Sequence, residues 1–323
     1  MRRRDFIKLT AGTVAAWPMM AHAQTYPSRP IAMNVPFAAG GPTDTIARII
    51  SERMRVSLGQ TLIIENVTGA DGTIGVGRVA RAPADGYTIG IGHWATHVLN
   101  GTAYSLQYDV LKDFKPVSLL ATNPLLIVTN NAVPAKDLQE LIRWLKTNQE
   151  KASVGTGSMV HRVSGAYFQN KTGIQCLFVP YRGAAPATQD MIAGQVTLMF
   201  DQAANALPHV RAGTTKAYAV TAKARLASAP AIPTVDEAGL PGFYVSVWHA
   251  LWVPKDTPEK IIATLNAAVV DTLADPVVRQ RLAELGQEIP PREQLTPEAL
   301  GAFHKAEVEK WWPIIKAANI KAQ

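Results

Sequence analysis

Two glycine-rich turns carry residue types that suit anion binding. Residues 36–44 read Pro-Phe-Ala-Ala-Gly-Gly-Pro-Thr-Asp, and residues 155–161 read Gly-Thr-Gly-Ser-Met-Val-His. Each turn follows a short apolar run and precedes a helical pattern. Its free backbone N–H groups therefore lie at a helix N-terminus, where anions bind readily. The first turn lacks the Gly-Lys-Ser/Thr sequence of a P-loop, which disfavours a nucleotide phosphate as the anion.

Polar side chains in these turns have two readings. Thr43 or Asp44 can cap the first helix, and Ser158 can cap the second, so a purely structural role and a binding role are both open at this point. His161 falls in the first turn of its helix, where the helix dipole opposes protonation, and we expect it to be neutral. Asp201 follows another apolar run and either orients a ligand amine or hydroxyl or caps the next turn. Trp94, beside two histidines, is either a platform for a ligand or a core aromatic.

Support for catalysis is weak. The chain has neither a Gly-x-Ser-x-Gly nor a His-Glu-x-x-His motif, and Ser158 and His161 share one helical turn, a poor geometry for a nucleophile and its base. The single cysteine, Cys176, excludes an intrachain disulfide framework and a zinc site built on several thiolates. We therefore expect no catalytic residue, metal or cofactor. The alternative is an exported α/β hydrolase that uses Ser158, His161 and Asp201.

Short apolar runs alternate with helical patterns along most of the chain, which predicts an α/β fold with a largely parallel sheet. Strands are expected at 31–37, 61–67, 87–92, 117–121, 125–129, 152–155, 176–180, 197–200 and 216–221. Three helices that begin near Pro258, Pro276 and Pro297 have no strands of their own, so we expect them to pack on the first part of the sheet.

A chain of 323 residues suggests two domains, and its content of 47% hydrophobic and 18% charged residues excludes a disordered or fibrous protein. The simplest arrangement sends the chain out of one lobe and back again. We expect lobe 1 to comprise residues 24–122 with 248–323, and lobe 2 to comprise residues 123–247. This double crossover places a ligand cleft between the lobes, at the carboxyl ends of the strands.

Residues 1–23 have the pattern of an export signal. Arg3 and Arg4 precede Asp-Phe-Ile-Lys as in a twin-arginine motif, and Ala-His-Ala at 21–23 is a cleavage site. The intervening apolar stretch is too short for a membrane anchor, so we expect a periplasmic protein. Removing the signal takes away four basic residues and one acidic residue, which lowers the net charge from +7 to +4. With no basic run and no further long apolar run, we expect neither nucleic-acid binding nor membrane insertion.

Several segments, in the same order along the chain, resemble those of the Bug-type periplasmic solute-binding receptors of tripartite tricarboxylate transporters. These segments are 26–31, 35–48, 155–161, 179–183 and 233–239. The resemblance implies an α/β fold of two lobes, the Venus-flytrap, type II-like fold of periplasmic binding proteins, without catalytic activity. It also implies a small-molecule carboxylate ligand, and as partner a membrane permease of the tripartite tricarboxylate type or a sensor protein.

The resemblance further implies that the two glycine-rich turns hold the ligand's carboxylate between the lobes. The residues it places at the site are Phe37, Gly41, Thr43, Asp44, Ala70, Gly72, Gly157, Ser158 and His161, with Trp94, Thr96 and Asp201 facing the variable end of the ligand. The loop 68–72 departs from the family's usual Pro-Gly-Ala-Gly-Gly, because Thr68 stands for the proline and Asp71 adds an acid. The family's ligands include dicarboxylates and aromatic carboxylates, so either kind is expected, and Trp94 and its neighbouring histidines favour a flat or aromatic acid.

Overall fold

The structure is a computed structural model that describes residues 26–181, 183–317, 319 and 320. The expected export signal at 1–23 lies outside these residues.

Strands and helices alternate as the apolar runs predict. The strands are β1 (Ile31–Val35), β2 (Leu62–Asn66), β3 (Thr88–His93), β4 (Phe114–Asn130), β5 (Ser153–Thr156), β6 (Leu177–Pro180), β7 (Leu198–Gln202), β8 (Thr215–Val220) and β9 (Ser246–Pro254). The helices of more than one or two turns are α1 (Pro42–Leu58), α2 (Thr73–Ala80), α4 (Leu138–Thr147), α5 (Met159–Thr172), α6 (Ala184–Ile192), α7 (Ala203–Arg211), α8 (Glu259–Ala274), α9 (Pro276–Glu284) and α10 (Pro297–Ala317).

Within the described residues, nine strands form one sheet in the order β2-β1-β3-β9-β4-β7-β5-β6, and β8 also pairs with β4. The pairs β1–β2, β1–β3, β5–β6 and β5–β7 are parallel, as the alternation of strands and helices predicts. The pairs that involve β4 or β9 are antiparallel. The sheet therefore consists of two parallel parts joined by two long antiparallel strands.

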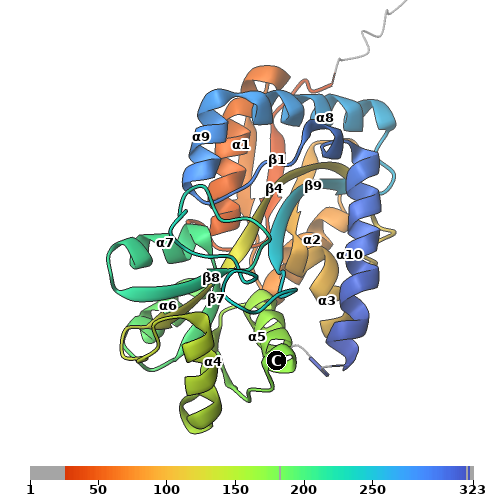
Figure 1. Cartoon of the computed structure of the whole chain (residues 1–323). Helices are drawn as coiled ribbons and strands as arrows, with labels where there is room; N and C mark the ends of the chain where they lie inside the picture. The colour runs from red at the N-terminus through yellow and green to blue at the C-terminus, as the bar shows by residue number, and fades with distance from the viewer. Residues whose placement is uncertain (1–25, 182, 318, 321–323) are drawn as a thin grey trace, which may run out of the picture.

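The chain crosses between the two parts on β4 and returns on β9. These two strands run side by side through the middle of the molecule, with α1, α8 and α9 at one end and α4, α6 and α7 at the other (Figure 1). The α/β fold of two lobes with a double crossover is thereby confirmed.

The prediction of two strands separated by residues 122–124 is wrong, because β4 continues through this segment. Pro124 lies where β4 ends its pairing with β9 and begins its pairing with β7, a changeover point at which its missing N–H costs no ladder bond. The buried amide of Asn123 donates to the Gly286 carbonyl at 2.9 Å, so its polar group is satisfied outside the sheet.

The three C-terminal helices begin where their prolines predict, and they pack against the first part of the sheet. An apolar core between α1, α8, α9 and this part includes Ile46, Ile50 and Leu265. Ion pairs at its rim join Arg53 to Asp275 at 3.0 Å and Arg281 to Glu52 at 2.7 Å. α10 lies along the other face and buries Trp311 against Trp94, with the ring centroids 4.8 Å apart.

No single helix in the described part of the chain is long and apolar enough to cross a membrane. The consecutive helices α8 and α9, bent by 74° at their junction, meet these requirements only when taken together.

Candidate functional site

A cavity of about 960 Å³ lies where the carboxyl ends of strands from both parts of the sheet meet. Its wall is formed by the segments that follow or end β1, β2, β3, β5, β6 and β7, the position at which open α/β sheets bind ligands. Tyr104, after the short helix α3 (Asn100–Ala103), closes one side. The N-termini of α1, α5, α6 and α7 lie in or beside this wall, so the positive ends of four helix dipoles face the cavity.

In the first glycine-rich turn, the backbone and Thr43 face the cavity and Asp44 does not. Gly41 is the N-cap of α1, and Pro42 occupies the first helical position. Asp44 is 1% exposed and accepts hydrogen bonds from the Gly40 N–H at 2.8 Å, from Arg48 Nε at 2.8 Å and from Asn66 Nδ2 at 2.9 Å. Burial alone would raise the pKa of the Asp44 carboxyl, but these bonds lower it below its ordinary value. Asp44 is thus an ionised residue that stabilises the turn and does not face the cavity.

Aromatic rings form part of the floor next to this turn. Phe37 stacks on the His93 ring with centroids 4.6 Å apart and planes 8° from parallel, and both residues line the cavity. Burial lowers the pKa of His93 to about 3, so its ring is neutral. The Thr43 hydroxyl lies 3.1 Å from Nε2 of His249 on β9, which ties the turn to the strand that returns between the lobes.

The second turn presents Gly157, Ser158 and His161 to the cavity. A Cβ on Gly157 would lie 2.2 Å from the carbonyl atoms of Gly183, so only glycine fits there. Ser158 is the N-cap of α5, as predicted, but its hydroxyl makes no capping bond and lies instead 3.0 Å from His161 Nδ1. On the other side of the ring, His161 Nε2 is 3.7 Å from Asp201 Oδ1.

Asp201 is the last residue but one of β7, and its carboxylate is buried in the cavity wall. It accepts hydrogen bonds from the Gln202 N–H at 2.8 Å and from Asn205 Nδ2 at 2.5 Å. The side chain therefore has a fixed orientation before any ligand binds. Asn205 follows Asp201 by one helical turn, so the i, i+4 spacing at the start of α7 is the sequence signal that could have identified it.

The loop after β2 brings a further acid into the cavity. Four consecutive residues of this loop, which includes η1 (Ala70–Gly72), have positive φ angles: 124° at Gly69, 45° at Ala70, 50° at Asp71 and 87° at Gly72. Asp71 Oδ2 accepts a hydrogen bond from the Met159 N–H at 3.1 Å, across the cleft. Burial raises the pKa of the Asp71 carboxyl, while the Met159 bond and nearby His161 oppose the rise.

Most of the residues that the sequence places at the site come together around this cavity. Those that line it are Phe37, Gly41, Thr43, Ala70, Gly72, Gly157, Ser158, His161 and Asp201. Asp44, Trp94 and Thr96 do not line it. Trp94 is fully buried against Trp311, and Thr96 donates to the His93 carbonyl at 3.0 Å in the segment around η2 (Ala95–Leu99). Because α10 packs on this segment, Trp94 points into the core instead of into the cavity. The residues around Trp94 alone do not predict this contact.

The lining residues that sequence reasoning missed as contacts include Asp71, Tyr104, Met159, Arg162 and Tyr181. The sequence could have identified Asp71, through its departure from the family's loop, and Tyr181, through the Pro-Tyr-Arg-Gly segment. No feature of the sequence points to Tyr104.

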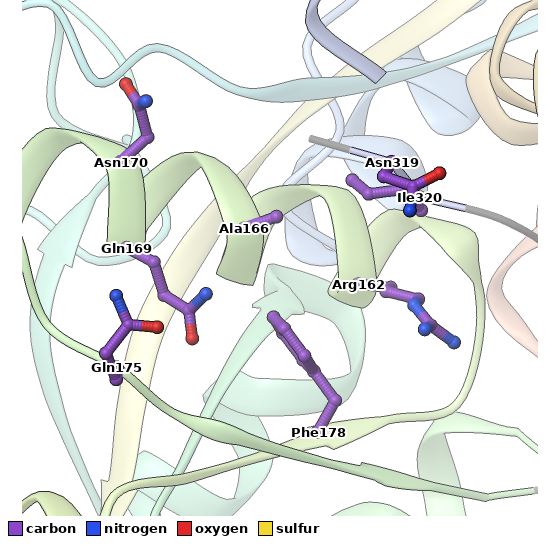
Figure 2. A pocket seen from close by; sticks show the side chains of 8 residues that line it. All are labelled: Arg162, Ala166, Gln169, Asn170, Gln175, Phe178, Asn319 and Ile320. Atoms are coloured by element: carbon purple, nitrogen blue, oxygen red, sulfur yellow. The ribbon is translucent and has the colours of Figure 1, made fainter. Parts of the chain in front are cut away.

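A smaller pocket of about 290 Å³ lies between α5, the start of β6 and the C-terminal segment. Figure 2 shows Phe178, Gln169 and Arg162 around it, with Asn319 and Ile320 on the opposite side. Arg162 lines both cavities, so α5 forms a wall between them. The smaller pocket has no carboxylate in its lining and lies away from the converging strand ends. The described residues also contain no group of three or more His, Cys, Asp or Glu that could hold a metal ion.

A ligand-sized cavity between two α/β lobes is typical of solute-binding receptors. The family model described as "Tripartite tricarboxylate transporter family receptor" matches residues 46–320, and the chain belongs to this family.

Three solved structures show the likeness in detail. MatC from Rhodopseudomonas palustris, with bound malate, is 40% identical, with a TM-score of 0.84 over 90% of this chain and 100% of that chain. The periplasmic binding protein BugD is 38% identical, with a TM-score of 0.84 over 92% of this chain and 100% of that chain. A further R. palustris protein, solved with adipate, is 32% identical, with a TM-score of 0.85 over 92% of this chain and 99% of that chain.

These matches confirm the Bug-type resemblance and the two-lobe fold. The family consists of solute-binding receptors rather than enzymes, and its members are periplasmic binding proteins, which supports a periplasmic location.

Proposed function

We propose that this protein captures a small carboxylate in the cavity between its lobes and delivers it to a transporter. The observation that carries this proposal is the convergence of helix N-termini from both parts of the sheet on one cavity. Free N–H groups and dipoles at such termini stabilise a carboxylate without a paired arginine. The malate in MatC and the adipate in the R. palustris neighbour support a carboxylate of similar size.

The residues of the two turns have different roles in this proposal. The backbone at Gly41 and Gly157 admits the ligand closely, and the hydroxyls of Thr43 and Ser158 donate to its oxygens. His161 and Asp201 contact the part of the ligand that lies farther from this carboxylate. Phe37, Ala70 and Gly72 complete the wall. Asp44 acts only through the turn that it braces, and Trp94 and Thr96 make no direct contact.

An aliphatic acid fits these observations better than an aromatic one. The expectation of a flat ligand rested on Trp94 and its neighbouring histidines, and Trp94 lies in the core beneath α10. The Phe37 and His93 rings already stack on each other, so the faces that they turn toward each other are not available to an aromatic ligand. We therefore propose a small aliphatic carboxylate, with one or two acid groups.

We propose a permease of the tripartite tricarboxylate type as the main partner, since the family is named for that transporter. A sensor protein is the alternative partner. We further propose that residues 1–23, with their paired Arg3 and Arg4, direct the folded chain to the periplasm by the twin-arginine route.

A hydrolase is a second candidate because Ser158, His161 and Asp201 form a chain of contacts in the cavity. The 3.7 Å distance from His161 to Asp201 is too long for a hydrogen bond, so the ring is not fixed as a general base requires. Hydrolysis of nitrophenyl esters by the wild-type protein, abolished in Ser158→Ala, would favour this candidate. Carboxylate binding without turnover would exclude it.

Thermal unfolding tests the receptor function. The protein is first unfolded and refolded to remove any bound ligand, and is then heated with aliphatic, amino and aromatic carboxylates in turn. A ligand at 100 times its dissociation constant adds about 2.7 kcal/mol to the free energy of unfolding, which raises the midpoint visibly. We expect a rise with aliphatic acids such as malate or adipate. A cooperative transition that no carboxylate shifts would contradict the proposed function.

A further inference from the structure

One helix N-terminus in the ligand cavity is already occupied by a carboxylate of the protein itself. The Met159 N–H at the start of α5 donates to Asp71 Oδ2 at 3.1 Å. Asp71 follows β2 in the first part of the sheet, and α5 follows β5 in the second part, so this bond spans the cleft between the lobes. Both residues line the cavity in which we propose that the ligand binds.

The start of α5 depends on this bond because its own cap is engaged elsewhere. The Ser158 hydroxyl contacts His161 Nδ1 at 3.0 Å and makes no bond to the helix N–H groups. By contrast, α4 and α9 begin with aspartates that cap them locally. Asp137 accepts from the Glu140 N–H at 2.8 Å, and Asp275 accepts from the Val277 N–H at 2.9 Å. The first N–H group of α5, that of Met159, therefore takes an acceptor from another part of the chain, and a carboxylate is the most favourable kind.

The loop around Asp71 directs its side chain across the cleft. The backbone of Asp71 has φ 50° and ψ 39°, a conformation uncommon for residues other than glycine. The buried Asn100 side chain donates to the Asp71 carbonyl at 2.9 Å and anchors it. The next residue, Gly72, lies so close to Thr96 and Phe37 that it has no room for a Cβ. The position of the carboxylate is thus set by the fold of lobe 1.

We propose that Asp71 is an internal competitor of the ligand. In the ligand-free protein its carboxylate occupies the N-terminus of α5 and holds the two lobes together, and an incoming carboxylate displaces it. The identity of the competing ligand rests on the proposed function, whereas the contact between the lobes does not. Asp71 would therefore lower the affinity for every carboxylate that uses α5, and only a ligand with further contacts in the cavity would replace it.

Two measurements on the same variants test this proposal. The variants are Asp71→Gly, which suits the positive φ, and Asp71→Asn, which keeps the shape without the charge. Asp85→Asn is the matched control, because Asp85 is a lobe 1 acid that pairs with Arg29 on the surface and lies outside the cavity. The first measurement is the distance between lobes in the ligand-free protein, by double electron–electron resonance. Spin labels are placed at Val56→Cys on α1 of lobe 1 and at Leu177→Cys on β6 of lobe 2, which are 66% and 70% exposed, in a Cys176→Ala background.

The second measurement is the calorimetric dissociation constant for malate and for adipate. We expect Asp71→Gly to lengthen and broaden the ligand-free distance distribution and to tighten binding about tenfold, the loss of one competing charge-assisted hydrogen bond. Asp71→Asn should show the same changes to a smaller extent, and Asp85→Asn should match the wild type. If Asp71→Gly fails to fold, Asp71→Asn decides the question.

The outcomes separate this inference from the proposed function. Distance distributions that are identical in wild type and both variants would overturn the contact between lobes. Weaker or unchanged binding in the variants would overturn the competition, and weaker binding would make Asp71 a ligand contact. If the variants open but neither acid binds to any form, the contact between lobes is supported and the proposed function fails for these acids.

Discussion

The two strand–turn–helix units that face the cavity differ in where the acid beside each turn comes from. At α1, the acid that braces the turn comes from the same helix, since Asp44 binds the Gly40 N–H and is held by Arg48. At α5, the local hydroxyl is turned toward His161, and the acceptor is Asp71 from another loop. The acid that binds the first turn therefore comes from the helix that follows it, whereas the acid that binds the second comes from the opposite side of the cleft.

We propose that this difference couples binding to closure. A ligand would bind first to the preformed surface on lobe 1, and the α5 N-terminus on lobe 2 would exchange Asp71 for the ligand as its acceptor when the lobes approach each other. Closure then requires only that the ligand binds the closed form more tightly than the open one. In the ligand-free protein Asp71 supplies part of the same interaction.

Of the substitutions in the two turns, Asp44→Ala is expected to cause the largest loss of stability, because it removes the acid that braces the first turn. The substitution removes the acceptor of the Gly40 N–H and one of the two acceptors of the half-buried Asn66 amide, and it leaves Arg48 without its partner, so we expect the free energy of unfolding to fall by about 3 kcal/mol. Because the pKa of Asp44 is lowered, its contribution is complete above the ordinary aspartate pKa of about 3.9 and is lost as the pH falls through the folded-state pKa. Urea unfolding between pH 2 and pH 7 measures both effects. Equal stability of variant and wild type at neutral pH would show that the turn does not depend on this acid.

Gly157→Ala should break the second turn by crowding. Its Cβ would lie 2.2 Å from the Gly183 carbonyl atoms, so the two loops must separate, and we expect a loss of about 2 kcal/mol in unfolding free energy together with loss of carboxylate binding. Gly301→Ala in α10 is the control, because its Cβ would meet only Pro116 at an ordinary 3.6 Å. This control should be neutral or slightly stabilising. Calorimetry and urea unfolding of both variants test the prediction, and normal binding by Gly157→Ala would refute the site.

Asp71→Asn is expected to change how the stability of the protein depends on pH. Since burial raises the pKa of Asp71, the wild-type protein loses stability as the pH rises from the ordinary aspartate pKa through the folded-state pKa, and the variant does not. The groups that face this carboxyl are His161 and Tyr104, and neither is changed by the substitution. As the pH rises from 4 to 7, we expect the melting temperature of the variant to increase relative to that of the wild type. A constant difference over this range would show that Asp71 is not enclosed.

Ser158→Ala should have the smallest effect on stability. Its hydroxyl does not cap α5, so we expect a loss below the roughly 1 kcal/mol of an ordinary N-cap, while carboxylate affinity falls. Asp137→Ala at α4, where the side chain does cap, is the matched comparison and should cost about 1 kcal/mol without any effect on binding. A larger stability loss in Ser158→Ala than in Asp137→Ala would mean that the hydroxyl acts as a structural cap.

Local features of the sequence predict much of this arrangement. Glycine, proline and capping residues mark the turns, so the N-cap at Ser158 and the helix starts at Pro276 and Pro297 are predicted correctly. Apolar runs mark the strands, whose ends then bring Asp201 and the two turns to one edge. We propose that the hinge lies where β4 changes partners at Pro124, near the predicted lobe boundary at 122.

Features that depend on distant packing are not predictable in this way. Trp94 is removed from the cavity by Trp311, which lies more than two hundred residues later in the chain. Asp44 points inward because the Asn66 amide of β2 donates a hydrogen bond to its carboxylate there, and Asp71 reaches Met159 only because lobe 2 folds against lobe 1. The alternation of apolar and polar residues along the chain does not predict these contacts.

The Met159 amide reports directly on whether a carboxylate binds between the lobes at the N-terminus of α5, because its N–H group lies at that terminus. Of the eight methionines in the chain, those in the described residues are Met33, Met54, Met159, Met191 and Met199, so a spectrum of protein labelled with ¹⁵N-methionine is simple to assign by substitution. Malate or adipate is added to refolded, ligand-free protein. We predict that the Met159 amide resonance shifts most, and that it shifts less when Ser158→Ala weakens binding. Binding that is evident by calorimetry but leaves the Met159 resonance in place would contradict the account.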